Sequence, residues 1–368
     1  MRKSRFLRIG AAGIMSIIGV LVLSCSDDNP VKPKSGWSWS ALGSGIAYPG
    51  ASPFVWALTS YDNKLFAGGQ FTTAGGGGAD YIAVWDGTTW SAPGSGMNTS
   101  IYALTIYDNK LIAGGAFMFA GGVSANGIAA WDGSSWAPLG LGMIGRVEAL
   151  TIYDNKLIAG GVFTTAGGIS ANRIAAWDGS SWSALGSGMD SAVSALFVYD
   201  NKLIAGGRFS TTGGVSANGI AAWDGSSWGP LGLGMDANVY ALTVYDGKLI
   251  AAGYFSQAGG ISANSIAAWD GSTWSPLGSG LDCDVDDLIV FDNKLIAGGC
   301  FGQAGGISVN RVAAWNGTSW ASLGEGLSGG NSPRGFAFAI MGNKLFVGGT
   351  FDAAGGVAAN NIAACSFK

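Results

Sequence analysis

From about residue 36 onward, short apolar runs alternate with short polar turns, and the whole pattern returns every 46 residues. Two tryptophans per repeat keep this spacing, from Trp85 and Trp90 to Trp315 and Trp320. A fixed period of this length indicates a chain built from repeated supersecondary units. A lysine marks each step, at Lys64, Lys110, Lys156, Lys202, Lys248 and Lys294, and a seventh, Lys344, follows after a four-residue insertion.

Each repeat holds four apolar runs, which in residues 147–189 read VEALTIY, KLIAGGVF, NRIAAWD and SSWSALGSGM. Their length and their β-branched and aromatic content favour strands over helices, and no helical period occurs after residue 24. Asp-Asn separates the first two runs and Asp-Gly the last two. Both pairs tolerate positive φ, so we expect two-residue hairpin turns at both places.

The runs are apolar or small throughout instead of alternating, which indicates sheets buried on both faces. A four-stranded antiparallel sheet covered on both faces by copies of itself is a propeller blade. Paired glycines in the second run, such as Gly160 and Gly161, suit a crowded position near the axis. The sequence therefore predicts an all-β, seven-bladed β-propeller. The alternative is an open β-solenoid, which needs capping ends.

The ends of the chain separate these two architectures. The last repeat stops after its third run, at IAACSFK, so its fourth run is missing there. Residues 39–46, WSALGSGI, match residues 182–189, WSALGSGM, in all but the last position. We expect this N-terminal segment to complete the last blade and to close the propeller, with residues 36–368 as one domain.

The first 24 residues have the features of an export signal. Four basic residues precede the apolar stretch 9–23, which is too short for a transmembrane helix. The sequence VLSC, ending at Cys25, resembles a bacterial lipobox. The resemblance implies cleavage before Cys25, acylation of its thiol, a tether over residues 25–35, and localisation at the outer membrane or surface of a bacterium. The alternative is an ordinary secretory signal followed by a chance cysteine.

Composition narrows the classes of function. Histidine is absent, which excludes Ser-His-Asp and Cys-His nucleophilic sites and histidine-ligated zinc. The net charge is −4, and removing the signal, with four of the 19 basic residues and none of the 23 acidic ones, makes it −8. An acidic chain without a basic patch is a poor candidate for nucleic-acid binding. We expect contact with a membrane only through the N-terminal lipid.

The repeat itself resembles a known group. The di-glycine in the second strand with tryptophans at later fixed positions is similar to kelch propellers. The stretch GGVFTTAGG…NRIAAWDGSSWSALGSGM resembles repeats of fungal cortical cell-polarity marker proteins and of bacterial exported proteins, over about residues 35–368. This resemblance implies a propeller at the cell surface. It implies no catalytic residues, because such scaffolds serve both enzymes and binding proteins.

One face of the predicted propeller varies between repeats. It carries the connections from each fourth strand to the next first strand, and from each second to third strand. Arg208, Tyr254 and Gln70 on this face are candidate ligand-binding residues, and neutral drift of exposed loops is the alternative. The residue after the di-glycine differs in every repeat: Gln70, Ala116, Val162, Arg208, Tyr254, Cys300 and Thr350.

Acidic residues cluster in the same loops. Asp190 and Asp236 occupy one equivalent position in neighbouring repeats, and both are candidate ligand-binding residues. The next repeat reads DCDVDD, where Asp282, Asp284 and Asp286 would lie on one side of an extended chain. Three readings stay open: a solvated acidic rim, a calcium site, and a site for a cationic ligand. The EF-hand pattern fails at its glycine and glutamate positions, and we expect no other cofactor.

Three cysteines remain after Cys25. A two-residue turn at Asp292-Asn293 would set Cys300 opposite Val285 and diagonal to Cys283. Diagonal partners lie about 7 Å apart, close to the limit for a bridge, so a Cys283–Cys300 disulfide and two free thiols both stay open. Cys365 takes the place of the first tryptophan of the repeat, and we expect a buried small side chain there.

Together these features predict a monomeric, lipid-anchored propeller that binds a protein or glycan partner through its variable face without catalysis. Two alternatives stay open. One is a carbohydrate-active or metal-assisted enzyme, which without histidine would depend on the loop carboxylates, on tyrosine or on a metal. The other is a purely structural envelope protein.

Overall fold

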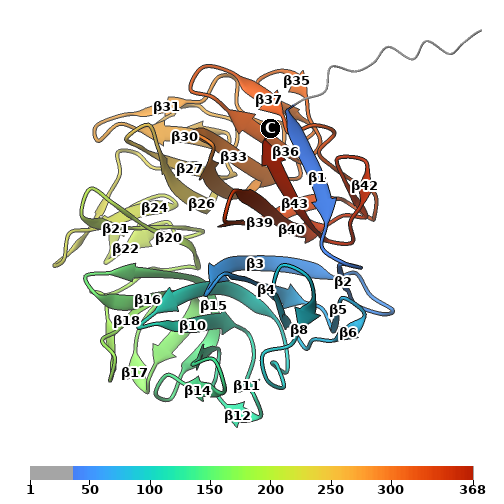
Figure 1. Cartoon of the computed structure of the whole chain (residues 1–368). Coiled ribbons are helices and arrows are strands. Elements are labelled where there is room, and N and C mark those ends of the chain that lie inside the picture. The colour runs from blue at the N-terminus through green and yellow to red at the C-terminus, as the bar shows by residue number, and fades with distance from the viewer. Residues whose placement is uncertain (1–35, 368) are drawn as a thin grey trace, which may run out of the picture. The chain divides into compact units, whose positions relative to one another are not determined.

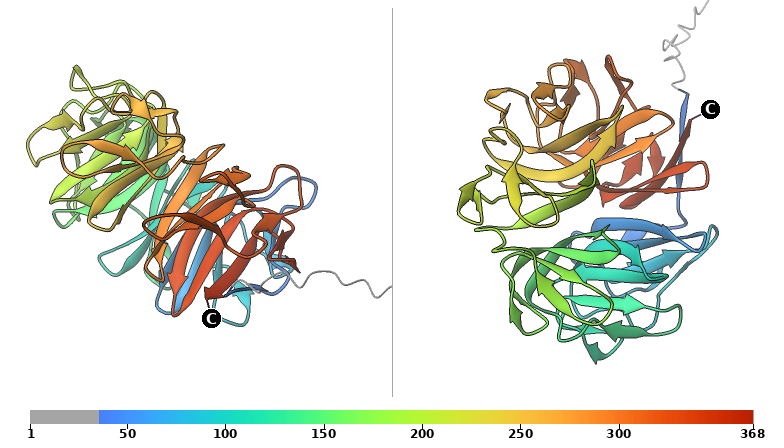
Figure 2. Two further views of the ribbon diagram at one scale, coloured as in Figure 1. Left: turned by 90° about the horizontal axis from the view of Figure 1, so that it is seen from above. Right: turned by 90° about the vertical axis from the view of Figure 1, so that its left-hand side faces the viewer.

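The computed structural model describes residues 36–367, and these form antiparallel sheets within one compact unit, Ser35–Lys368 (Figures 1 and 2). Every regular element of the described residues is a β-strand. None of these residues forms a helix long and apolar enough to cross a bilayer. The predicted export signal, Cys25 and the tether lie outside the described residues.

Seven of the sheets in residues 36–367 share one four-strand order, in which each strand pairs antiparallel with the next. Their first strands are β3 (Phe54–Tyr61), β9 (Ile101–Tyr107), β15 (Met143–Tyr153), β20 (Val193–Tyr199), β26 (Asn238–Tyr245), β32 (Val285–Phe291) and β39 (Arg334–Met341). Their second strands are β4 (Lys64–Gln70), β10 (Lys110–Gly115), β16 (Lys156–Ala166), β21 (Lys202–Gly207), β27 (Lys248–Tyr254), β33 (Lys294–Gly299) and β40 (Lys344–Thr350).

The two outer strands of each sheet are shorter. The third strands are β7 (Ile82–Trp85), β13 (Ile128–Trp131), β18 (Ile174–Trp177), β24 (Ile220–Trp223), β30 (Ile266–Trp269), β36 (Val312–Trp315) and β43 (Ile362–Phe367). The fourth strands are β8 (Trp90–Ser91), β14 (Trp136–Pro138), β19 (Trp182–Ala184), β25 (Trp228–Pro230), β31 (Trp274–Pro276), β37 (Trp320–Ser322) and, from the N-terminal end, β1 (Trp37–Ala41).

The connections between second and third strands form small hairpins of their own. Their strands are β5 (Thr73–Ala74), β6 (Gly77–Gly78), β11 (Phe119–Ala120), β12 (Val123–Ser124), β17 (Ile169–Ser170), β22 (Thr211–Thr212), β23 (Val215–Ser216), β28 (Gln257–Ala258), β29 (Ile261–Ser262), β34 (Gln303–Ala304), β35 (Ile307–Ser308), β41 (Ala353–Ala354) and β42 (Val357–Ala358). β2 (Ile46–Ala47) and β38 (Leu327–Ser328) each add a third strand to one of them.

The sheet at the C-terminal end contains strands from both ends of the described chain. β1 pairs antiparallel with β43, with Trp37 opposite Phe367 and Trp39 opposite Cys365 (Figure 1). This is the pairing that the match between residues 39–46 and 182–189 predicts. Cys365 is buried, and burial raises the pKa of its thiol to about 12. It therefore packs as a small apolar side chain, as expected.

The second tryptophan of each repeat ties its sheet to the preceding one. In each case the indole N–H donates to a backbone carbonyl of the neighbouring sheet, as Trp182 Nε1 does to Leu139 O at 2.9 Å. The terminal strand takes part in the same way, because Trp39 Nε1 donates to Leu323 O at 3.0 Å. Trp90 Nε1 in turn donates to Leu42 O, just after β1, at 2.9 Å.

The two kinds of hairpin turn differ. The predicted two-residue turn between first and second strands is confirmed, since Tyr107 pairs with Lys110, and Asp108 and Asn109 both have positive φ. The predicted two-residue Asp-Gly turn between third and fourth strands is wrong. Trp131 pairs directly with Trp136, so the loop has four residues, Asp-Gly-Ser-Ser.

The aspartate of this four-residue loop explains its length. Asp132 Oδ1 accepts hydrogen bonds from the backbone N–H groups of Ser134 and Ser135, both at 2.8 Å. A carboxylate that satisfies two loop N–H groups stabilises the longer turn. The same backbone hydrogen bonds lower the pKa of Asp132.

The di-glycine of each second strand lies where two neighbours come close. A Cβ on Gly114 would lie 2.6 Å from the side chain of Val147 in the next sheet. A Cβ on Gly115 would clash with the backbone oxygen of Ser100, which directly precedes the first strand of its own sheet. The predicted crowding is therefore real, and it arises between adjacent strands and sheets.

Candidate functional site

Each of the seven first strands contains a β-bulge at the same place. In β3, Val55 pairs with Gly69 and Ala57 with Gly68, so the residue between them, Trp56, has no partner on β4. A bulge of this kind frees one side chain from the ladder and redirects it. The bulge residues are Trp56, Tyr102, Glu148, Ser194, Tyr240, Asp286 and Phe336.

The seven bulge residues line one cavity of about 320 Å³, together with the residues that follow them on the first strands. This volume is at the lower end of the roughly 300–1,000 Å³ typical of ligand sites. The next position along each strand is alanine in six sheets and Asp287 in the sheet of β32. The lining therefore differs between sheets at the bulge, whereas the framework around it repeats.

Aromatic side chains from three sheets form a continuous row on one side of this cavity. Trp56 stacks on Phe54, with ring centroids 5.2 Å apart and an interplanar angle of 21°. Trp56 also contacts Tyr102 at 4.8 Å, and Phe54 contacts Phe336 at 6.0 Å. All four side chains are half-buried. We call Phe336, Phe54, Trp56 and Tyr102 the aromatic row.

An arginine lies at each end of the aromatic row. The Cζ atom of Arg146 lies 6.0 Å from the ring centroid of Tyr102, and that of Arg334 lies 5.6 Å from Phe336. Both distances are within the range of cation–π contacts. Arg146 Nε also donates to Glu148 Oε1 at 2.6 Å, so its guanidinium is held by an acid as well as by a ring.

The opposite side of the cavity is polar. Glu148 Oε2 accepts a hydrogen bond from Ser194 Oγ at 2.9 Å. Tyr240 accepts one from Asn238 Nδ2 at 3.1 Å. The guanidinium of Arg208 lies 5.9 Å from the Tyr240 ring. This side therefore presents a carboxylate, two hydroxyls and an amide, whose positions are fixed by their contacts with one another.

Two aspartates share Arg334 beside β32 and β39, and Asp287 lies next to them. Arg334 Nη2 donates to Asp284 Oδ2, and Arg334 Nε lies 3.0 Å from Asp286 Oδ2. Asp287 accepts hydrogen bonds from the backbone N–H groups of Phe338 and Leu288, at 2.7 and 2.8 Å. Burial raises the pKa of Asp286 to about 7, although Arg334 opposes the shift. Burial likewise raises the pKa of Asp287 to about 7.

The predicted ligand-binding residues of the variable face do not line the cavity. Arg208 and Tyr254 are exposed, and Gln70 is half-buried. Arg208 reaches the site only by packing over Tyr240, and Gln70 pairs with Phe54 across β3 and β4. These residues therefore surround the site instead of forming it.

Asp190 and Asp236 have a structural part in the loops. Asp190 accepts hydrogen bonds from the backbone and hydroxyl of Ser210 and from the backbone of Thr211, and Asp236 accepts the equivalent bonds in the next repeat. Burial opposes these hydrogen bonds, but together they lower the pKa of both carboxyls. Their repetition in the sequence reflects this loop geometry, so the prediction of ligand contacts receives no geometric support.

The predicted acidic triad does not form a common site. Asp282 turns to the backbone N–H groups of Gly302 and Gln303, at 2.8 and 2.9 Å, in the manner of Asp190. Asp284 and Asp286 instead pair with Arg334. Asp282 lies in the loop before β32, where it caps the neighbouring hairpin, so the three carboxylates do not share the extended geometry on which the prediction rested.

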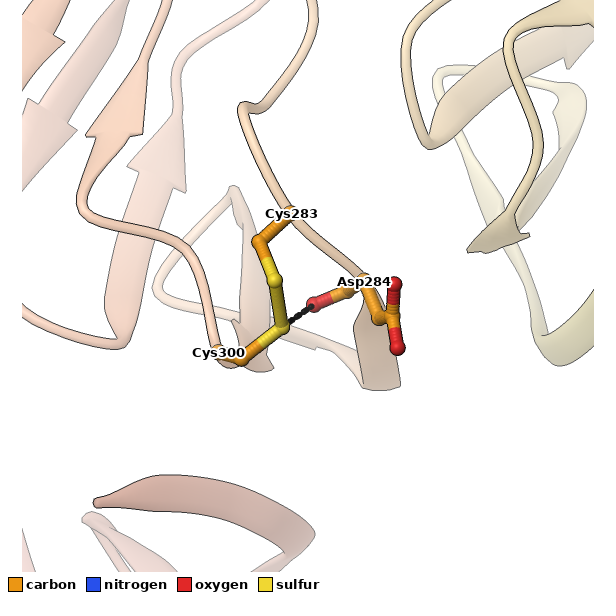
Figure 3. Close-up of side chains that lie close together, drawn as sticks. All are labelled: Cys283, Asp284 and Cys300. Atoms are coloured by element: carbon orange, nitrogen blue, oxygen red, sulfur yellow. Dashed lines mark hydrogen bonds between the residues drawn. A yellow bond between two sulfur atoms is a disulfide. The ribbon is translucent and has the colours of Figure 1, made fainter. Parts of the chain in front are cut away.

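A disulfide joins Cys283 to Cys300 beside this arginine cluster, with their Cα atoms 5.6 Å apart (Figure 3). Cys300 Sγ also contacts the backbone oxygen of Asp284 at 3.6 Å, whereas the carboxylate of Asp284 points away from the sulfurs. Bonded sulfurs are not thiolate ligands, so this group of side chains does not constitute a metal site. The predicted register was wrong by one residue, because the bulge sets Val285 opposite Gly299 and not opposite Cys300.

We expect the Cys283→Ser/Cys300→Ser double variant to unfold with a free energy lower by about 2–3 kcal/mol, because the bond closes a loop of 17 residues in the unfolded chain. Guanidinium unfolding with and without dithiothreitol measures this. The reductant should destabilise the wild-type protein and leave the double variant unchanged. Equal stability of the two oxidised proteins would contradict the expectation.

A second cavity, of about 370 Å³, lies between the last sheet and the first. Its lining includes Leu42, Trp85, Phe346 and the turn that precedes Lys344. The last sheet has no loop joining its outer two strands, because β1 and β43 come from opposite ends of the described chain. The bulge cavity, which gathers acids, arginines and aromatic rings, is therefore the candidate functional site.

The sequence did contain a signal for the bulge residues. They follow the same 46-residue step as the lysines. The bulge residue differs from repeat to repeat, whereas in most repeats the residue before it is aliphatic and the residue after it is alanine. Our reading of the first strand as a regular strand missed them, because an unbroken strand would not set this position apart from its neighbours.

Comparisons with known proteins agree with the architecture. A family model described as a β-propeller domain of unknown function (DUF5122) matches residues 246–267. The WD40 β-propeller domain of Doa1 is similar with a TM-score of 0.59 and 16% identity, over 90% of this chain and 96% of that chain. The computationally designed Ika8 protein is similar with a TM-score of 0.50 and 20% identity, over 85% and 87%. No curated protein matches the chain. Identities this low show the fold alone, which is a β-propeller.

Proposed function

We propose that the seven repeated sheets are the blades of one closed, kelch-like seven-bladed propeller, with β1 as the closing strand. The first strand of each sheet contacts that of the next, and β3 of the first sheet contacts β39 of the last. A Cβ on Gly348 of β40 would lie 2.5 Å from Val55 of β3, so these sheets pack as closely as the others. Tryptophan N–H groups link the sheets on both sides of β1.

We further propose that the protein is an exported lipoprotein of a bacterial envelope, anchored through Cys25. The VLSC sequence supports this reading. A disulfide between Cys283 and Cys300 is also typical of proteins that mature in an oxidising compartment.

For the activity, we propose non-catalytic binding of a protein or glycan partner at the bulge cavity and the variable face around it. One observation carries the proposal. The framework of the seven sheets repeats almost without change, whereas the cavity-lining position holds a different side chain in nearly every sheet. A repeated scaffold with a diversified lining suits recognition. Of the acids on which a catalytic reading depends, Asp190, Asp236 and Asp282 cap their own loops, and Asp284 and Asp286 pair with Arg334.

The test is capture of envelope components by the immobilised full chain. Glycan and protein fractions are passed separately over the wild-type protein and over an Arg208→Ala/Tyr254→Ala double variant. We expect the double variant to retain at least several-fold less material. Lys156→Ala/Lys202→Ala is the matched control, because both lysines are exposed and follow turns between first and second strands, outside the cavity lining and the variable face. Equal capture by the wild-type protein and the double variant would count against binding on this face.

A further inference from the structure

The aromatic row consists of half-buried rings that the stability of the scaffold does not require. Its side chains are half-buried, although equivalent positions in other sheets hold Glu148, Ser194 and Asp286 with the same backbone geometry. Because polar residues are accepted at this position, the scaffold does not need an aromatic ring there. Half-exposed aromatic rings that continue from one sheet to the next are typical of a surface that a ligand covers.

We propose that the aromatic row binds the apolar face of a sugar ring, so that the ligand of this cavity is a glycan. The inference rests on the proposed binding function and narrows its ligand to one class. A pyranose ring presents C–H groups on its faces and hydroxyl groups around its edge. A flat aromatic surface takes up the C–H face by burial and dispersion, while polar groups at the margins bind the hydroxyls.

The margins of the aromatic row have the groups that sugar hydroxyls need. Arg146 at one end and Arg334 at the other each present N–H donors, of which a guanidinium has five. Glu148 beyond Arg146 supplies carboxylate acceptors, and Ser194 and Tyr240 supply hydroxyls across the cavity. Donors and acceptors thus flank the apolar surface on both sides, in positions fixed by their own contacts.

The charge balance favours a glycan over a charged peptide. Arg146 is paired with Glu148, and Arg334 with Asp284 and Asp286, so that no arginine at the ends of the row is left to bind an anionic peptide. The volume of the cavity also favours a glycan. A cavity of about 320 Å³ enclosed by the first strands admits a few sugar units or one chain end. A stable protein interface buries about 1,200–2,000 Å² of surface, which a cavity of this size does not offer.

The experiment is isothermal titration calorimetry of the full chain with four oligosaccharides: cellopentaose, mannopentaose, chitopentaose and an oligogalacturonide. We expect at least one to bind with a dissociation constant below about 1 mM, which corresponds to about −4 kcal/mol. Trp56→Ala should weaken that binding at least tenfold, because it removes the centre of the row. Lys156→Ala/Lys202→Ala, on the turns between first and second strands, should leave it unchanged. If Trp56→Ala lowers the melting temperature, Phe336→Ala tests the same row from the neighbouring sheet.

The outcomes separate this inference from the proposed function. Binding of none of the four sugars would overturn the glycan assignment, and so would a bound sugar whose affinity survives both Trp56→Ala and Phe336→Ala. If the sugars fail to bind while the protein fraction is captured and Arg208→Ala/Tyr254→Ala abolishes the capture, the binding function stands with a protein as its partner. If neither the binding of sugars nor the capture of envelope fractions changes in these variants, both proposals fail.

Discussion

Replacing Trp39 with alanine will destabilise the protein as much as replacing Trp182, although Trp39 lies near the N-terminal end of the described chain and Trp182 at its middle. Both indoles are almost fully buried, with 9% and 6% of their surface exposed. Each donates its N–H to a backbone carbonyl of the preceding sheet. Removing a buried tryptophan costs about 3–5 kcal/mol, and we expect this loss in both variants.

The comparison tests the closure of the propeller. A strand at the end of a chain often frays, and a substitution in a frayed strand costs little. If β1 holds the last blade, the two variants lose equal stability in urea or guanidinium unfolding. A loss of less than about 1 kcal/mol for Trp39→Ala, beside the full loss for Trp182→Ala, would contradict both the closure of the propeller by β1 and the count of seven blades.

Deleting residues 37–46 should have a larger effect than either substitution. The segment pairs with β43 over five residues, and its Ile46 is fully buried. Ile46 O also accepts a hydrogen bond from Asn361 Nδ2 at 2.8 Å. We expect a melting temperature lower by more than about 5 °C, because the loss exceeds about 3–5 kcal/mol and a domain of this size loses roughly 1.5 °C per kcal/mol. An unchanged melting temperature would show that the last sheet does not need β1.

The second large effect concerns pH. The free energy of unfolding of the wild-type protein should fall as the pH rises from about 4 to 8, owing to Asp286 and Asp287. Their pKa values are raised to about 7 in the folded protein, whereas an unfolded aspartate titrates near 3.9. Between these values the two groups bind more protons in the folded state than in the unfolded state, so their contribution to stability is fully present below pH 4 and is lost as the pH passes 7.

Replacing Asp287 with alanine, the residue that the six other sheets have at this position, should remove much of this slope. We expect a gain of about 2–4 kcal/mol at pH 8 relative to pH 4, set against the loss of the hydrogen bond from Phe338. Unfolding in guanidinium at several pH values measures it. Asp190→Asn is the control, because the pKa of Asp190 is lowered in the folded protein. A pH profile of Asp287→Ala parallel to that of the wild-type protein would contradict the expectation.

The regular parts of this fold could be predicted because they depend on local chemistry repeated many times. The Asp-Asn turn follows from the positive φ that those residues tolerate, and the partner of β1 follows from a direct match of residues 39–46 with an internal repeat. Both features can be read from a few neighbouring residues. The length of the Asp-Gly-Ser-Ser loop could not, because it depends on a carboxylate that bonds two N–H groups further along.

The candidate site was missed because it arises from pairing between strands. Trp56 and Asp286 line the cavity because each lies in a bulge, and a bulge is a property of two paired strands, not of one sequence segment. The same bulge moved the partner of Val285 from Cys300 to Gly299. Reading the first strands as unbroken directed attention to the loops, where Asp190 and Asp236 repeat for structural reasons.

The pairing of β1 with β43 also determines when the last sheet can form during synthesis. The first strand of the described residues has the last one as its partner, and Trp39 donates a hydrogen bond to a carbonyl 284 residues away. Until the last residues are available, β1 has no partner and the growing array has an open edge. Contacts between residues this far apart in the sequence slow folding, and strand edges that stay unpaired meanwhile are prone to aggregation. The last sheet can therefore be completed only after β43 has been made, whereas each earlier sheet has all its strands within one stretch of the chain.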